Sequence, residues 1–234
     1  MLDVISKTEY FLSLDDIAVS AFLKSSPHDL KRVQDAYIYS LLKSERCSKI
    51  IEVGGGNSRV LKGLDCSNEL WNLDEFIGRD GGPSSVITID GVKTVVGRLG
   101  AFSSQLPSNY FDMLFSVSVV EHLPTAQSVF NFFSDGARIL KEGGVMHHAI
   151  DLYLQDEPFE YSSKRVEMYS QLSTQAGLIF VQKPAIDANI RFRCSYATNP
   201  DLGIYAWNKM VPQISEQRLN SQSVSLKMAL KKIH

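Results

Sequence analysis

The residues best suited to chemistry gather where a short apolar run ends. The run at 50–53 contains Glu52 and leads into Gly54-Gly55-Gly56-Asn57-Ser58. A glycine-rich turn between a strand and a helix lets a ligand approach bare backbone, which is typical of a cofactor site. A dinucleotide fingerprint would need a glycine at position 59, where Arg59 stands. A nicotinamide-dependent oxidoreductase is therefore the less favoured interpretation.

Four side chains further along the chain could act as acids or bases. They are Glu121, His122, His148 and Asp151, and we expect them at the carboxyl ends of two neighbouring strands. His147 and His148 cannot both face one pocket, because successive strand residues point to opposite faces. If one of the two is a base, we favour His148, although a structural role is the favoured interpretation of each histidine taken singly. No metal site is expected, since no spacing such as H-x-x-x-H is present.

Short apolar runs alternate with helical patterns from residue 49 onward, which predicts an α/β fold with a doubly wound, mostly parallel seven-stranded sheet. Strands are expected at 49–53, 69–76, 92–99, 111–119 and 143–152, with the last ones in 178–184 and 190–208; helices are expected at 58–64, 125–140 and 162–177. We divide the chain into an N-terminal helical extension or lid (1–45), a core (46–212) and a C-terminal tail (213–234). The tail shows apolar residues on one helical face beside lysines, so we expect a basic amphipathic helix. A frayed surface helix is the favoured interpretation, and contact with a membrane or a partner is the alternative.

The glycine turn also carries a family resemblance. The run E-V-G-G-G-N-S (52–58) resembles the E/D-x-G-x-G-x-G/S motif of class I S-adenosylmethionine-dependent methyltransferases. The run Y-F-D-M-L-F-S-V-S-V-V-E-H-L-P (110–124) is similar to the fourth-strand segment of the small-molecule members, with its E-H-x-P ending. I-L-K-E-G-G (139–144) is similar to their L-K-P-G-G turn. The resemblance implies a Rossmann-like fold, S-adenosyl-L-methionine as cofactor and S-adenosyl-L-homocysteine as product.

The resemblance also implies which residues bind the cofactor. Asp74 follows Glu52 by about 20 residues, the separation at which an acidic side chain binds ribose hydroxyls. Many relatives hold the adenine amino group with an acidic residue after the third strand, but this chain has G-R-L-G-A at 97–101. We therefore expect the backbone around Leu99 to hold adenine. The full predicted set is Glu52, Gly54, Gly55, Gly56, Asn57, Ser58, Asp74, Leu99, Gly100, Ala101, Ser116 and Val117.

Composition limits the remaining choices. The chain has 234 residues, 44% of them apolar, and a net charge of −2, so a single sizeable core is available and no basic excess for nucleic acid is present. No motif of the N/D-P-P-Y type for a flipped base is found. We expect the protein in the cytoplasm, because acidic residues lie near the start, no long apolar run is present and the three cysteines show no pairing pattern.

The favoured function is methyl transfer to a hydroxyl of a small molecule such as a sugar or natural product. A catalytically silent partner subunit is the alternative.

Overall fold

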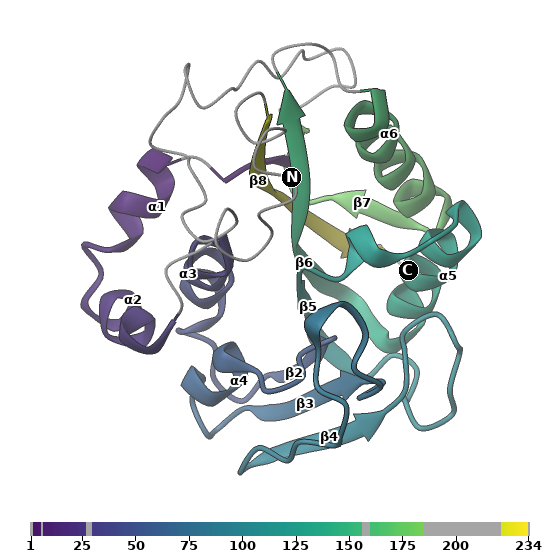
Figure 1. Cartoon of the computed structure of the whole chain (residues 1–234). Coiled ribbons are helices and arrows are strands. Elements are labelled where there is room, and N and C mark those ends of the chain that lie inside the picture. Colours follow the sequence, from purple (N-terminus) through teal and green to yellow (C-terminus); the bar gives the residue numbers. More distant parts are fainter. Residues whose placement is uncertain (1, 6, 27–29, 156–159, 185–220, 234) are drawn as a thin grey trace.

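A computed structural model of the chain describes residues 2–5, 7–26, 30–155, 160–184 and 221–233 (Figure 1). Its centre is one sheet with the strand order β1-β8-β6-β5-β2-β3-β4, in which β7 also pairs with β8. Strands β4, β3, β2, β5 and β6 are parallel, whereas β8 runs antiparallel to its neighbours. The strands are β1 (Leu2–Val4), β2 (Lys49–Val53), β3 (Glu69–Asp74), β4 (Val92–Val96), β5 (Phe111–Val117), β6 (Leu140–Gln155), β7 (Leu178–Phe180) and β8 (Ser221–Lys232).

Helices cover both faces of this sheet. The helices α1, α2, α3 and α4 lie on one face and α5 and α6 on the other (Figure 1). Three short 3-10 turns lie at Leu23–Ser25, Arg79–Gly81 and Val120–His122. The helices are α1 (Lys7–Ser13), α2 (Ile17–Phe22), α3 (Leu30–Leu42), α4 (Arg59–Gly63), α5 (Ala126–Ile139) and α6 (Glu160–Gln175). In the described part of the chain, none of them is long and apolar enough to cross a membrane.

The apolar residues explain this layered arrangement. Ile50 and Ile51 point to opposite faces of β2, and both are fully buried, as a strand covered by helices on both sides requires. Helix α5 begins at a capping box between Thr125 and Ser128 and packs an apolar stripe that includes Val129 against the sheet. The predicted doubly wound α/β fold is therefore confirmed.

Two expectations about the ends of the described chain are wrong. The predicted amphipathic helix in the tail is the strand β8, whose Leu226, Met228 and Leu230 are fully buried in the sheet. Leu226 and Leu230 are four residues apart, which fits a helix, but the apolar residues also alternate with a period of two, which fits a strand. The sheet also has eight strands rather than seven, because Leu2–Val4 adds β1 beside β8. The strand expected within 190–208 lies outside the described residues.

Candidate cofactor and acceptor site

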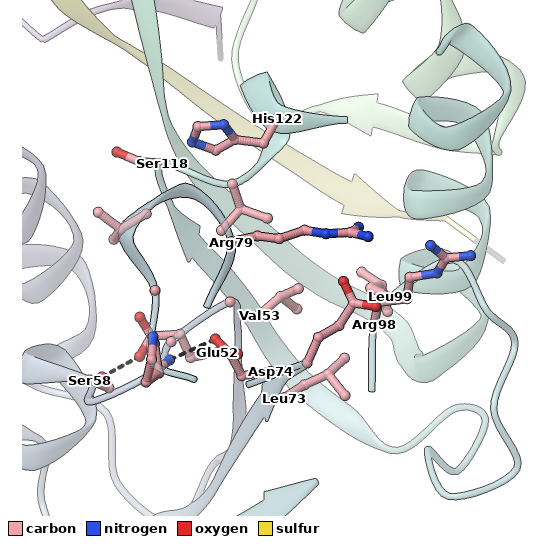
Figure 2. A pocket seen from close by; sticks show the side chains of 18 of the residues that line it. Glu52, Val53, Ser58, Leu73, Asp74, Arg79, Arg98, Leu99, Ser118 and His122 are labelled. Carbon is pink, nitrogen blue, oxygen red and sulfur yellow. Dashed lines mark hydrogen bonds between the residues drawn. The ribbon is translucent and has the colours of Figure 1, made fainter. Parts of the chain in front are cut away.

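A cleft of about 890 Å³ opens at the carboxyl ends of the parallel strands (Figure 2), where open α/β sheets bind their ligands. Most of the predicted cofactor residues and one predicted acid–base residue line it. These are Glu52, Gly54, Gly55, Gly56, Asn57, Ser58, Asp74, Leu99, Gly100, Val117 and His122. Five other predicted residues are not part of its lining: Ala101, Ser116, Glu121, His148 and Asp151. Within the predicted lid (1–45), only Lys31 and Asp35 of α3 contribute to the described lining.

The turn after β2 has a conformation that requires glycine. Gly54 and Gly56 have φ angles of +69° and +51°, which side chains other than glycine rarely adopt. A Cβ atom on Gly54 would lie 2.5 Å from Val119 Cγ2, and one on Gly55 would lie 2.5 Å from Asn72 Oδ1. Because these three residues have no side chains, the cleft wall at 54–56 consists of backbone atoms.

The carboxylate of Asp74 links β3 to this turn. Its Oδ2 accepts a hydrogen bond of 2.9 Å from the Gly56 amide, and its Oδ1 accepts one of 2.7 Å from the Phe76 amide. The side-chain amide of Asn72 donates to the Gly56 carbonyl over 2.8 Å. These hydrogen bonds hold the Asp74 carboxylate in place in the cleft lining. Each of its oxygens can still accept a further hydrogen bond, so the group can bind the two hydroxyls of a ligand diol.

Glu52 lies beneath the same turn and is 4% exposed. Its carboxyl accepts a hydrogen bond from the Ser58 hydroxyl, which also caps α4 by accepting from the Leu61 amide over 2.9 Å (Figure 2). Burial raises the pKa of Glu52 to about 8. A cation bound next to this carboxyl would favour its ionised form, so the site suits a positively charged group.

The loop after β4 contains the residues predicted to contact adenine. The Gly100 and Phe102 amides both donate to Asp135 Oδ2 of α5, over 2.8 and 3.0 Å. The Gly100 amide is thus already used, and Ala101 lies outside the cleft lining. Leu99 and Gly100 still line the cleft, so an adenine contact with the backbone at Leu99 stays a prediction.

His148 and Ser116 are also placed differently from the prediction. His148 is fully buried, with Nδ1 2.8 Å from Ser116 Oγ and its ring against Phe132 and Phe133. Burial lowers the pKa of His148 to about 3, so the ring is neutral across the working pH range. The preference for His148 as the base, and the cofactor contact expected of Ser116, are corrected because both side chains face the core under α5.

The other end of the cleft contains polar groups from several elements. Ser118 and His122 lie there, away from Glu52 and Asp74 (Figure 2). Ser118 was missed by the sequence analysis, as was an ion pair across the cleft wall in which Arg59 Nε lies 2.6 Å from Asp35 Oδ2. An aspartate among the apolar residues of the helix at 30–42, such as Asp35, is the sequence signal that could have pointed to this wall.

The two remaining acid–base candidates lie behind Ser118. Asp151 Oδ1 accepts a hydrogen bond of 2.7 Å from the Ser118 hydroxyl. Neither carboxyl oxygen of Glu121 has a partner with hydrogen-bond geometry among the described residues, and burial, followed by the charge of Asp151, raises its pKa to about 8. The structure thus brings Glu121 and Asp151 together next to the cleft rather than in its lining. No group of three or more metal-ligating side chains that could hold an ion is found in the described ranges.

Comparisons with known proteins match one part of the chain to a family model and the whole fold to solved structures. Residues 51–147 match the family model for a methyltransferase domain. Significant matches are absent among curated protein sequences. Similar solved structures include a candidate sarcosine dimethylglycine methyltransferase from Galdieria sulphuraria, at 16% identity and a TM-score of 0.55 over 86% of this chain and 85% of that one.

Two further structures span nearly the whole chain. The [4+2]-cyclase SpnF has 14% identity and a TM-score of 0.56 over 99% of this chain and 97% of that one. The geranyl diphosphate C-methyltransferase of Streptomyces coelicolor A3(2), in complex with Mg²⁺, geranyl diphosphate and S-adenosyl-L-homocysteine, has 12% identity and a TM-score of 0.54 over 99% and 89% of the two chains. At such identities the likeness concerns the fold. Residues 51–147 therefore match a methyltransferase domain, and the chain has the fold of the class I S-adenosylmethionine-dependent methyltransferases.

Proposed function

We propose that this protein transfers the methyl group of S-adenosyl-L-methionine to a hydroxyl of a small-molecule acceptor and releases S-adenosyl-L-homocysteine. The observation that carries the proposal is the continuity of one cleft. Its lining extends from the glycine turn and Asp74 to the hydroxyl of Ser118 and the imidazole of His122. A donor and an acceptor can therefore share one enclosed space, which is the main requirement for methyl transfer.

The cofactor end fits this donor. S-adenosyl-L-methionine has a ribose diol for Asp74, an ammonium and a sulfonium whose positive charges suit Glu52, and no phosphate. A Cβ atom on Gly54, Gly55 or Gly56 would lie only 2.5–3.0 Å from neighbouring side chains, so only glycine fits this turn, which lines the cleft with backbone that a ligand can approach. When bound, the cofactor supplies an electrophilic methyl group, and the residues of the chain align the acceptor with it and exclude water.

The opposite end of the cleft supports a small polar acceptor. A volume of about 890 Å³ suits a cofactor together with a compact second ligand, since ligand pockets span roughly 300–1,000 Å³. Ser118, His122 and Lys31 offer hydrogen bonds and charge at that end. The net charge of −2 argues against nucleic acid as the acceptor. Sugars and natural-product hydroxyls are the acceptor classes we propose.

The proposal is tested in two steps with the full chain. Calorimetric titration with S-adenosyl-L-homocysteine, with NADH in parallel, is expected to show binding of the former alone. Tritium transfer from methyl-labelled S-adenosyl-L-methionine is then measured with phenols, sugars and hydroxy acids. NADH binding alone would contradict the cofactor assignment. Cofactor binding without transfer to any of these hydroxyls would contradict the acceptor assignment and support a silent partner subunit.

A further inference from the structure

A buried hydrogen-bond network lies directly behind the acceptor end of the cleft. Asp151 Oδ1, on β6, accepts hydrogen bonds from the Gln34 side-chain amide over 2.6 Å and from the Ser118 hydroxyl over 2.7 Å. The Gln34 amide also lies 3.2 Å from Ser225 Oγ on β8, and Ser118 Oγ lies 2.9 Å from Gln34 Oε1. Gln34 of α3 and Ser118, just after β5, thus contact the Asp151 carboxylate directly, and Ser225 of β8 joins the network through Gln34.

Ser118 is the member of this network that lines the cleft. Its φ angle of +51° is unusual for a residue other than glycine, and such strain is most often kept at functional sites. The Ser118 amide donates to the Ala149 carbonyl over 2.8 Å, which fixes this conformation against β6. The strained backbone therefore holds one hydroxyl between the cleft and the half-buried carboxylate of Asp151.

The hydrogen bonds determine which way the Ser118 proton points. A hydroxyl has one proton, and both oxygens near it, on Asp151 and Gln34, lie on the buried side. The lone pairs of Ser118 Oγ remain able to accept a hydrogen bond from a ligand in the cleft. Asp151 Oδ1 accepts hydrogen bonds from two donors, whereas burial and the charge of Asp151 raise the pKa of the neighbouring Glu121.

We propose that Ser118 and Asp151 form a proton relay that deprotonates the acceptor hydroxyl, with Gln34 as the residue that positions Asp151. The acceptor O–H bond breaks as its proton passes to Ser118 Oγ, and the original Ser118 proton passes to Asp151 Oδ1. The acceptor oxygen forms a bond to the methyl carbon, and the electron pair of the breaking S–CH₃ bond stays on sulfur. The products are the methyl ether, S-adenosyl-L-homocysteine and a protonated Asp151. This inference rests on the proposed function.

Two phenols of different acidity test the relay. Phenol itself is protonated at pH 8, whereas 4-nitrophenol is largely ionised there and needs no base. Ser118→Gly and Asp151→Asn are expected to lower kcat for phenol about 10²- to 10³-fold, the usual contribution of a general base. For 4-nitrophenol we expect a loss below about tenfold. Glycine tolerates a positive φ, so Ser118→Gly removes the hydroxyl without adding backbone strain.

Matched controls lie away from the cleft. Ser173→Ala changes a buried serine of α6 that bonds within its own helix, and Asp112→Asn changes a carboxylate near the start of β5. Both controls are expected to keep wild-type rates with both phenols. All variants are expected to bind S-adenosyl-L-homocysteine with wild-type affinity.

Each outcome of the phenol assay has a distinct meaning. Equal losses for both phenols would show that Ser118 and Asp151 only shape the cleft, and unchanged rates would show that another group takes the proton; either result overturns the relay while methyl transfer stands. Wild-type protein that binds the cofactor but methylates neither phenol, sugar nor hydroxy acid overturns the hydroxyl acceptor, and the relay with it. A selective loss with phenol in both variants supports the relay.

Discussion

The carboxylate of Asp74 holds the amide of Gly56 at 2.9 Å, so the end of β3 fixes the glycine turn that follows β2. This contact joins two parts of the cofactor end that come from neighbouring strands. Because the Phe76 amide occupies the other oxygen at 2.7 Å, the carboxylate cannot rotate freely. A ligand diol would therefore meet a group whose orientation is already set, which reduces the entropy lost on binding.

Replacement of Asp74 by alanine is expected to weaken binding of S-adenosyl-L-homocysteine by about 1–3 kcal/mol, the cost of one or two lost hydrogen bonds to a charged group. Asp74→Asn keeps the shape and is expected to lose less. Calorimetric titration measures both affinities. An affinity equal to that of the wild type in Asp74→Ala would rule out the ribose assignment.

Gly54→Ala is expected to abolish measurable cofactor binding, whereas Gly91→Ala leaves it intact. Both glycines have strongly positive φ angles, +69° and +72°, so both variants suffer similar backbone strain of about 1 kcal/mol. They differ in space, since a Cβ atom on Gly54 would lie 2.5 Å from Val119 and one on Gly91 would meet no atom within 4 Å. Thermal unfolding of both variants shows whether a loss of affinity results from a loss of stability instead. Equal affinities in the two variants would mean that the turn does not contact the cofactor.

The pH dependence of stability is expected to change in Glu52→Gln. The folded-state pKa of Glu52 is raised from 4.5 to about 8, so between these values the folded protein retains a proton that the unfolded chain has lost. The free energy of unfolding of the wild type therefore falls as pH rises through this window, by up to about 1.4 kcal/mol per pH unit from this group. Glu121 contributes in the same direction.

Urea titrations at pH 5.5, 7.0 and 8.5 measure this effect. The unfolding free energy of Glu52→Gln is expected to fall less steeply with pH than that of the wild type, because a neutral amide has no proton to release. Glu75→Gln, just after β3, serves as the control for the change from a carboxylate to an amide, since Glu75 lines the same cleft. A parallel pH dependence in wild type and Glu52→Gln would contradict the raised pKa.

Alanine substitution of the two histidines, His148 and His122, is expected to affect the stability of the protein to different extents. His148→Ala removes a buried ring and is expected to destabilise the protein by about 2–4 kcal/mol, as large-to-small core substitutions do. Its affinity for S-adenosyl-L-homocysteine stays unchanged below the unfolding temperature. Chemical denaturation and calorimetry together separate the two effects.

His122 is exposed and lines the cleft, so His122→Ala is expected to change stability by less than about 0.5 kcal/mol. Its effect on methyl transfer is expected to stay below the roughly 10²-fold loss typical of a missing general base, since the relay of Ser118 and Asp151 takes the proton. A larger loss, confined to phenol and absent with 4-nitrophenol, would assign the base to His122 instead.

The cofactor end could be predicted from sequence because its parts are local. The glycine turn and Asp74 lie at the ends of adjacent parallel strands, within one strand-helix-strand unit, so their meeting follows from the alternation of elements. The glycines of the turn, and an acidic residue at a fixed separation from Glu52, can be recognised directly in the sequence. The fold class followed from the same alternation.

The acceptor end could not be predicted because its residues are distant in sequence. Gln34 reaches Ser118 and Asp151 across 84 and 117 positions, and no spacing rule encodes such a contact. The use of the Gly100 amide by Asp135, 35 positions away, was hidden for the same reason. The error in β8 had another cause, since its apolar residues satisfy the periods of both a helix and a strand.

The pairing of β1 with β8 also has consequences for how the molecule is made. Leu2 pairs with Met228, so this edge of the sheet cannot close before nearly all of the described chain has been synthesised. Contacts between such distant segments form slowly, because a long loop must be closed before they contribute any stability. The unit at 49–100, with the glycine turn and Asp74, needs no such closure.

The two ends of the cleft are therefore expected to form at different stages of folding. The network of Gln34, Ser118 and Asp151 requires α3, β6 and β8 together, because the Gln34 amide also contacts Ser225 of β8. The nucleoside-binding half can reach its final arrangement while the half that meets the second substrate is still open. Folding intermediates of this chain are then expected to recognise the donor before they can select an acceptor.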